Sequence, residues 1–282
     1  MAVLPMPELK IDEERLLVER ARQGDGAAMG SLVEPWRRPL LGYIYRMVTH
    51  RQDAEDLLQD VLVRVLEGIR EYRGEARFKS WLFGIATHVC LDHLRAKKRW
   101  RVEAQSLGEK AATEDPQGYP QLRETMQQEE FRFEIREHIA FCFSCISRTL
   151  PPEEQAALML REVLEFSGEE AAGILGVSEP VARHRLAAAR AKMIQDYEGL
   201  CALINKTGAC HQCRGLREIA PEAHRGPDMV QIEVAPGKTV NPESLFDARI
   251  QIARQADLED GKTRPIHDMF FAGLTRQEES AR

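Results

Sequence analysis

The sequence has few aromatic residues, 6% of its 282 positions, and no apolar run that approaches the roughly 18 residues needed to cross a bilayer. The beginning of the chain also lacks the basic stretch followed by an apolar stretch that is typical of a signal peptide. We therefore expect no membrane segment and a cytoplasmic location. Structural disulfides are rare in that compartment, so paired cysteines are expected to bind a metal or to respond to oxidants.

Sequence motifs of catalysis are missing as well. No P-loop, G-x-S-x-G, H-E-x-x-H or dinucleotide-binding fingerprint occurs in the chain. Residues 214–282 carry no other recognisable motif and form a segment too short for a catalytic domain of usual size. The sequence therefore predicts a protein that is not an enzyme.

The residues that are abundant favour helices. Hydrophobic residues make up 43% of the chain and charged residues 30%, and Leu, Ala, Val and Ile are interleaved with Glu and Arg. A chain of this length is expected to hold about two domains. The expected fold class is mainly α.

Basic residues gather in two places, although the net charge of the chain is −6. Residues 87–101 carry five basic residues against one acid, and residues 181–192 carry four basic residues and no acid. Between these stretches, residues 102–134 carry eight acids against three bases. This distribution is typical of a protein that contacts nucleic acid at two places.

An amphipathic helix is predicted over residues 53–69. Its expected core stripe, at helical spacing, consists of Leu58, Val61, Leu62, Val65, Leu66 and Ile69. Its opposite face carries Asp53, Asp56, Asp60, Arg64 and Glu67. Such a charged face is solvated in most proteins, so its use as an interface needs support from other features of the chain.

The second basic stretch lies in a predicted helix-turn-helix. Residues 167–193 show two short helical patterns joined at residues 176–178, where Ser178 suits an N-cap and Pro180 is tolerated in a first turn. The side expected to pack on the first helix is formed by Ala182, Leu186, Ala189 and Met193. The other side presents Arg183, His184, Ala187 and Arg190. Alanines between arginines allow the backbone to approach a DNA groove closely; a basic hairpin without a ligand is the alternative.

Two further segments differ in composition from these helices. Residues 102–125 are poor in apolar side chains and contain prolines and a glycine, which predicts a linker. Beyond Cys210, the stretch 230–240 has an extended pattern and the stretch 242–260 a helical one. The C-terminal part is therefore expected to be a small extension of mixed structure.

Three motifs together resemble one family. They are "DAEDLLQDVLVRVL", "RFKSWLFGIATHVCLDHLRAKKR" and "LPPEEQAALMLREVLEFSGEEAAGILGVSEPVARHRLAAARAKM". In this order they resemble bacterial RNA polymerase sigma factors of the extracytoplasmic-function (ECF) type, which have only the second and fourth sigma domains. The resemblance covers roughly residues 12–198.

The resemblance implies a transcription initiation factor of four parts. These are sigma domain two (1–101), an acidic linker (102–130), sigma domain four (131–199) and a C-terminal extension (200–282). In the family, domain two binds core polymerase and melts the −10 promoter element, and the helix-turn-helix of domain four reads the −35 element. The implied partners are core RNA polymerase, through the β′ clamp coiled coil and the β subunit, promoter DNA and an anti-sigma protein.

Carried onto this chain, the resemblance implies three sets of contact residues. The polymerase-binding set is Asp53, Glu55, Asp56, Leu57, Gln59 and Asp60. The set for the −10 element is Phe78, Lys79, Trp81, His88, Asp92, Arg95 and Lys98. The set for the −35 element is Arg183, His184, Arg185 and Arg190. Capture of an unstacked base requires aromatic residues beside a basic groove, although core packing is the alternative for Phe78 and Trp81.

The chain departs from the family pattern at several of these positions. His88 stands where the family usually has Asn, and His184 replaces a common Ser. Pro180 and Val181 replace a common Gly-Thr pair. These substitutions leave the expected scaffold intact. They affect which promoter sequence the chain is expected to recognise.

Cysteines occur as two C-x-x-C pairs. The pair Cys210 and Cys213 lies in a polar, glycine-flanked stretch, which is typical of one half of a tetrahedral zinc site. The pair Cys142 and Cys145 shares a helical face with isoleucines, so core packing is its alternative. His138 precedes it with a spacing that resembles the zinc motif of a class of anti-sigma proteins, which makes His138 a substitute ligand.

The hypothesis is a structural zinc ion held by both cysteine pairs; its rival is a redox switch in which the pairs form disulfides and alter DNA binding. The two remaining cysteines, Cys90 and Cys201, are expected in the core. For the whole chain, the rival function is a stand-alone helix-turn-helix regulator with zinc or redox sensing. Binding to core polymerase discriminates between the two functions.

Overall fold

The described part of the protein is helical. The computed structural model describes residue 7, residues 10–96, 118–201, 212–225 and 241–256, residue 258 and residues 261–269. Within these ranges there is no strand, and an isolated parallel bridge joins Phe133 and Arg225. The mainly α fold class is confirmed, and the stretch 230–240, expected to be extended, lies outside the described residues.

The chain forms two compact units, each assembled from separate stretches of sequence. The N-terminal unit contains residues 2–98 and 152–187, and the C-terminal unit contains residues 99–151 and 188–282. The middle part of the expected domain four, residues 152–187, is thus in the same unit as most of the expected domain two. The C-terminal extension shares its unit with the helix that opens domain four.

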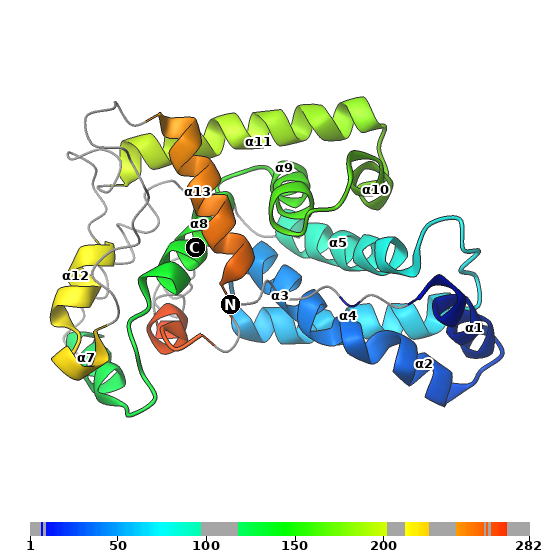
Figure 1. Cartoon of the computed structure of the whole chain (residues 1–282), viewed down its shortest axis with the longest axis horizontal. Coiled ribbons are helices and arrows are strands. Elements are labelled where there is room, and N and C mark those ends of the chain that lie inside the picture. The colour runs from blue at the N-terminus through cyan, green and yellow to red at the C-terminus, as the bar shows by residue number, and fades with distance from the viewer. Residues whose placement is uncertain are drawn as a thin grey trace. The chain divides into compact units, whose positions relative to one another are not determined.

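Nine helical elements lie wholly within the N-terminal unit as described (Figure 1). They are α1 (Ile11–Arg22), α2 (Gly26–Val33), η1 (Glu34–Trp36), α3 (Arg37–Val48), α4 (Arg51–Gly68), α5 (Phe78–Ala96), α9 (Pro152–Leu158), η2 (Met159–Val163) and α10 (Gly168–Ile174). The first part of α11 (Glu179–Leu200) also belongs to this unit. Local signals start these helices: the Asp25 carboxylate accepts hydrogen bonds from two amides of α2, and His50 Nδ1 accepts one from the Asp53 amide of α4.

Aromatic side chains form much of the core of the N-terminal unit. Phe83 of α5 lies in edge-to-face contact with Trp36, at 6.3 Å between ring centroids, and with Phe166, at 5.2 Å. All three rings are buried. Phe166 follows a π-helical turn, η2, in which the Leu164 amide donates to the Met159 carbonyl. Phe166 therefore attaches the segment between η2 and α10 to α5.

Helix α4 corrects one expectation about its core stripe. Leu58, Val61, Val65 and Ile69 are buried, but Leu66 is 57% exposed. At 100° per residue, Leu66 lies about 80° around the helix from Leu58, at the edge of the stripe. Its place in the core was therefore predicted wrongly.

The helix-turn-helix has the predicted turn. Helix α10 begins with a capping box between Ser167 and Glu170, and it ends at Ile174. Gly176 has a φ of +64°, a left-handed conformation that glycine adopts without strain. Helix α11 begins at Glu179, and the Ala182 amide donates to the Ser178 carbonyl at 3.0 Å.

The C-terminal unit contains a helix where a linker was expected. Its elements are α7 (Gly118–Gln127), α8 (Ile135–Ser147), the rest of α11, α12 (Gln212–Ile219), η3 (Glu222–His224), α13 (Pro242–Gln255) and the helical residues 264–269. Helix α7 falls within the stretch 102–130 that was expected to be a linker. Its Met126 is buried, and Leu122, one turn earlier, packs against the same cluster. This polar segment thus packs on the cluster through two apolar residues one turn apart.

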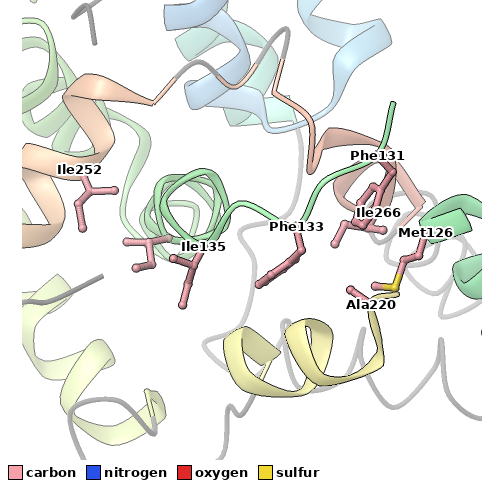
Figure 2. Close-up of a cluster of buried hydrophobic side chains, with 8 residues drawn as sticks. Met126, Phe131, Phe133, Ile135, Ala220, Ile252 and Ile266 are labelled. Carbon is pink, nitrogen blue, oxygen red and sulfur yellow. The ribbon is translucent and has the colours of Figure 1, made fainter. Parts of the chain in front are cut away.

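One buried cluster joins the linker region, domain four and the extension (Figure 2). Its residues come from both ends of the unit's sequence; they are Met126, Phe131, Phe133, Ile135, Ile139, Ala220, Ile252 and Ile266. A second contact is aromatic: Phe246 of α13 lies 5.8 Å from Phe143 of α8 and 6.3 Å from Tyr197 of α11, measured between ring centroids. The extension is thus part of the core that covers α8.

Shortening a core side chain of α13 tests this arrangement. Ile252→Ala removes buried methyl groups from the shared cluster and is expected to lower the free energy of unfolding by about 2–5 kcal/mol. Urea unfolding measures the loss, and hydrogen exchange should show faster exchange in α8. Gln251→Ala, at an exposed neighbouring position, is the control and should change stability by less than about 0.5 kcal/mol. Unchanged exchange in α8 of the Ile252 variant would show that the extension is only loosely attached.

Candidate nucleic-acid interface

Helix α4 presents a surface that combines acids with exposed apolar side chains. This α4 surface is formed by Asp56, Gln59, Asp60, Val63 and Leu66, all of them exposed. Val63 and Leu66 are 52% and 57% exposed, and they lie three residues apart on the same side of the helix. Sequence reasoning missed both residues, because helical spacing alone placed Leu66 in the core. The α4 surface thus combines exposed acids with two exposed apolar residues that follow them along the helix.

The other three residues of the predicted polymerase-binding set are less available. The Asp53 carboxylate lies between two imidazoles, 3.3 Å from Nδ1 of His50 and 3.3 Å from Nε2 of His93. Glu55 accepts a hydrogen bond from Nε of Arg51 at 2.6 Å. Leu57 is buried. In this structure the accessible members of the set are Asp56, Gln59 and Asp60.

The first turn of α5 holds an aromatic group. Trp81 packs against Tyr72, at 4.9 Å between ring centroids, and against Phe78, at 5.7 Å. Gly68 leaves room for the indole, because a Cβ at that position would lie 3.2 Å from Cζ2 of Trp81. Phe78 is fully buried and Trp81 is half-buried. Of the two aromatic residues in the predicted −10 set, Trp81 is the one that offers surface.

Polar residues of the same set extend along α5. His88 and Asp92 are exposed, and Nδ1 of His88 lies 2.7 Å from the Gly84 carbonyl oxygen. The Lys79 ammonium lies 4.1 Å from the centroid of the Phe166 ring, and the neighbouring Ser80 hydroxyl donates to Glu170 at 3.4 Å. Lys98 lies outside the described residues. The face of α5 that was predicted to meet DNA thus contacts the segment that leads into the helix-turn-helix.

Arg95, near the end of α5, is paired with an acid of α9. Its Nε and Nη2 donate to one carboxylate oxygen of Glu153 at 3.1 Å and 2.8 Å. Burial raises the pKa of Glu153, but the hydrogen bond from Arg95 and the charges of Arg95 and Arg185 outweigh it, so this pKa lies below its usual value. The Glu153 carboxylate therefore interacts electrostatically with Arg95 of α5 and Arg185 of α11, the two helices predicted to contact DNA.

The predicted −35 set on α11 is partly engaged. Arg183 and His184 are exposed, and Arg185 is half-buried. Arg190 donates to Asp247 of α13 at 2.7 Å, and its guanidinium lies 5.1 Å from the centroid of the Phe246 ring. No sequence motif pointed to Asp247, since it lies in the extension, 57 residues from its partner.

The predicted zinc ligands are only partly described. On α8, Cys145 is buried and Cys142 is half-buried. Cys210 lies outside the described residues; Cys213 falls in α12, at a position where the side chain is not described. In the described ranges, no group of three or more His, Cys, Asp or Glu side chains could hold a metal ion. His138, the substitute ligand, instead places its Nδ1 3.1 Å from Nε2 of His267.

The pair His138 and His267 joins α8 to the C-terminal residues. Both rings are buried, and His267 stacks on Phe141 with 3.7 Å between ring centroids. Burial lowers the pKa of His138 to about 4 and that of His267 well below its ordinary value, where the charge of His138 also contributes. Both rings are therefore neutral in the folded protein at neutral pH.

This pair makes stability depend on pH. The unfolded chain binds protons at these histidines below about pH 6.5, whereas in the folded chain burial lowers the pKa of His138 to about 4 and shifts the pKa of His267 in the same direction. The free energy of unfolding should therefore fall as the pH is lowered through this window. Urea unfolding at several pH values measures the fall. The variant His267→Phe keeps a ring stacked on Phe141 but removes one titrating group. Its free energy of unfolding should therefore fall less than that of the unmodified protein over the same pH range. An equal fall would show that His267 does not contribute to the pH dependence.

The described part of the chain contains no helix with the length and apolar character required to span a membrane. Family models match in two places: "Sigma-70 region 2" matches residues 32–100, and "Sigma-70, region 4" matches residues 141–193. The first match contains α4 and α5. The second contains most of α8, the helix-turn-helix and part of α11.

Curated relatives are similar over the same part of the chain. The ECF RNA polymerase sigma factor SigG of Mycobacterium tuberculosis is 31% identical over 61% of this chain and 48% of its own length. The RNA polymerase sigma-H factor of Pseudomonas aeruginosa is 29% identical over 64% of this chain and 91% of its own length. The chain therefore spans about half the length of the SigG relative and most of the sigma-H factor.

A solved structure, that of CnrH in complex with the cytosolic domain of CnrY, has 20% identity and a TM-score of 0.46, with 64% of this chain and 95% of the other covered. The ECF RNA polymerase sigma-E factor of Haemophilus influenzae is 30% identical over 65% of this chain and 94% of its own length. With both sigma-70 regions matched in order and a relative covered almost completely, this chain belongs to the ECF RNA polymerase sigma factors.

Proposed function

We propose that this protein is a transcription initiation factor that binds core RNA polymerase and directs it to specific promoters. The observation that carries the proposal is the pair of surfaces on the N-terminal unit. The α4 surface offers exposed apolar and acidic side chains to a protein partner, and α5 offers Trp81 beside basic residues to DNA. A protein with this role acts through binding and performs no catalysis, in the cytoplasm, where transcription takes place.

The polymerase contact is assigned to the α4 surface. Asp56 and Asp60 supply charge for basic residues of a partner, while Val63 and Leu66 supply apolar area. The partner implied by the family is the clamp coiled coil of the β′ subunit, with further contact to the β subunit. Asp53 and Glu55 belong to the same helix, where Asp53 contacts the imidazole of His50 and Glu55 accepts a hydrogen bond from Arg51. We assign them a supporting role in this surface.

The promoter contacts are assigned to α5 and α11. Trp81 suits stacking on an unpaired base of the −10 element, held in place by the buried Phe78. Lys79, Arg95 and Lys98 are expected to neutralise phosphates there. The exposed residues Arg183 and His184, with Arg185 and Arg190, are assigned to the −35 element.

Two accessory features belong to this proposal. An anti-sigma protein is expected to hold the factor inactive by covering these same surfaces. A structural zinc ion bound by Cys142, Cys145, Cys210 and Cys213 would fasten the C-terminal extension to α8. Such an ion would act on the fold rather than on initiation itself.

The alternative function is a stand-alone helix-turn-helix regulator with zinc or redox sensing. Such a protein binds duplex promoter DNA without polymerase. The exposed apolar residues of α4 favour the initiation factor, because a stand-alone regulator gives them no partner.

Reversing a charge on the α4 surface tests the polymerase contact. Asp60→Arg is expected to weaken binding to purified core polymerase by at least about tenfold, or about 1.4 kcal/mol, and to reduce promoter-dependent transcription in parallel. Glu19→Arg, an exposed residue of α1, makes the same charge change and should leave both unaffected. The unmodified chain is also tested for binding to promoter DNA without core polymerase. If it binds, and if adding core polymerase does not increase its affinity for the DNA, the stand-alone regulator is supported instead.

Removing the acid that pairs with Arg95 tests the DNA contact. Promoter DNA must displace the Glu153 carboxylate before a phosphate can reach Arg95. Glu153→Gln should therefore tighten binding of a −10 oligonucleotide by about two- to fivefold, since an exposed ion pair contributes up to about 1 kcal/mol. Fluorescence anisotropy measures the affinity. The adjacent change Glu154→Gln alters the net charge equally; if it tightens binding as much, the effect is one of charge alone.

A further inference from the structure

Helix α13 of the C-terminal extension holds one of the arginines assigned to the −35 element. Arg190 of α11 donates from Nη2 to Oδ1 of Asp247 at 2.7 Å, and its guanidinium lies 5.1 Å from the centroid of the Phe246 ring. This part of α11 and α13 belong to the same compact unit. The Arg190 side chain is 28% exposed, and that of Asp247 is 58% exposed. Two consecutive residues of α13 thus bind the guanidinium, one through its charge and the other through the face of its ring.

Helical spacing places this contact on the side of α11 that carries predicted DNA contacts. Arg183, Arg190 and Tyr197 follow one another at intervals of seven residues, so they lie along one side of the helix. Arg183 is exposed, whereas Tyr197 is buried, with its ring centroid 6.3 Å from that of Phe246. Phe246 therefore contacts both Arg190 and Tyr197, and α13 packs along the C-terminal part of this side.

Helix α13 is fixed to its unit independently of the ion pair. The Phe246 ring also packs on Phe143 of α8, at 5.8 Å between centroids. Arg249 of α13 is 1% exposed; its Nη2 donates to Sγ of Cys201 at 3.0 Å, and its guanidinium lies 4.4 Å from the centroid of the Tyr197 ring. Cys201, which the sequence placed in the core, is itself buried. Arg190 can therefore leave Asp247 by moving its own side chain while α13 stays in place.

The Asp247 carboxylate occupies Arg190 in the way that DNA would. Carboxylates and phosphates both accept hydrogen bonds from the planar N–H groups of a guanidinium, and both carry negative charge. Guanine edges accept from the same N–H groups. A promoter must therefore displace Asp247 before it can bind Arg190.

We infer that α13 is an autoinhibitory element that lowers the affinity of the chain for the −35 element by binding Arg190 through Asp247. This inference rests on the proposed function, which assigns Arg190 to that element. The inhibition is graded, because an exposed ion pair changes affinity by up to about fivefold. The extension therefore raises the strength that a −35 element must have, and does not prevent binding.

Removing the charge of Asp247 in the full-length chain tests the inference. Asp247→Asn keeps the size of this exposed side chain and leaves the core contacts of α13 in place. The probe is a fluorescent duplex carrying a promoter selected from a randomised pool by the unmodified chain bound to core polymerase. Fluorescence anisotropy of the variant bound to core polymerase should show about two- to fivefold tighter binding. A duplex that lacks the −35 half should bind both proteins equally.

Two further changes identify the cause of the gain. Glu243→Gln removes the same charge from an exposed position one turn earlier on α13 and should tighten binding much less. In a chain with Arg190→Ala, Asp247→Asn should tighten binding no more than Glu243→Gln does, since the acid then has no arginine to hold. Circular dichroism verifies that each variant is folded; if Asp247→Asn is not, Asp247→Ala replaces it.

Several outcomes would overturn the inference. Unchanged or weaker binding with Asp247→Asn would make α13 a support for Arg190 instead of a competitor of DNA. An equal gain from Glu243→Gln, on the duplex without its −35 half, or in the Arg190→Ala background would show that the effect does not pass through Arg190. A chain that fails to bind core polymerase overturns the proposed function and this inference together, whereas failure of the inference alone leaves binding to core polymerase intact.

Discussion

The burial of α8 is the constraint on which the C-terminal unit depends. Ten of its 13 residues are buried, so this helix needs apolar cover on nearly every side. Helix α13 provides one side of the cover through Phe246 and Ile252, and α7 and α12 contribute to the same core. Because burial of one such apolar side chain is worth about 1.5–3 kcal/mol, the extension stabilises α8 more than any surface ion pair does.

In the N-terminal unit, contacts of unequal strength hold the helix-turn-helix segment to α5. The pair Arg95–Glu153 is exposed and contributes at most about 1 kcal/mol. The contact of Phe166 with Phe83 is fully buried and contributes more. The ion pair therefore places an acid beside the basic end of α5, while the aromatic contact sets the position of the segment.

Features with a local cause could be predicted from the sequence, whereas features made by distant residues could not. The turn around Gly176 and the helix after Pro242 follow from capping residues and periodicity. The exposure of Leu66 could not be predicted, because periodicity does not say where a partner helix stops covering a stripe. The pairing of Cys201 with Arg249 depends on how α13 packs, and no pattern within either segment indicates it.

Because its core includes residues from near the end of the chain, the C-terminal unit can complete its fold only late in synthesis. Helix α8 is translated more than a hundred residues before Ile252 and Ile266, which cover it. Until those residues leave the ribosome, part of the apolar surface of α8 lacks its native cover and is open to chaperones and proteases. A product that ends before α13 would carry α5 and α11 on an incomplete fold. The position of these core residues in the sequence therefore favours the removal of chains that end before α13 is complete.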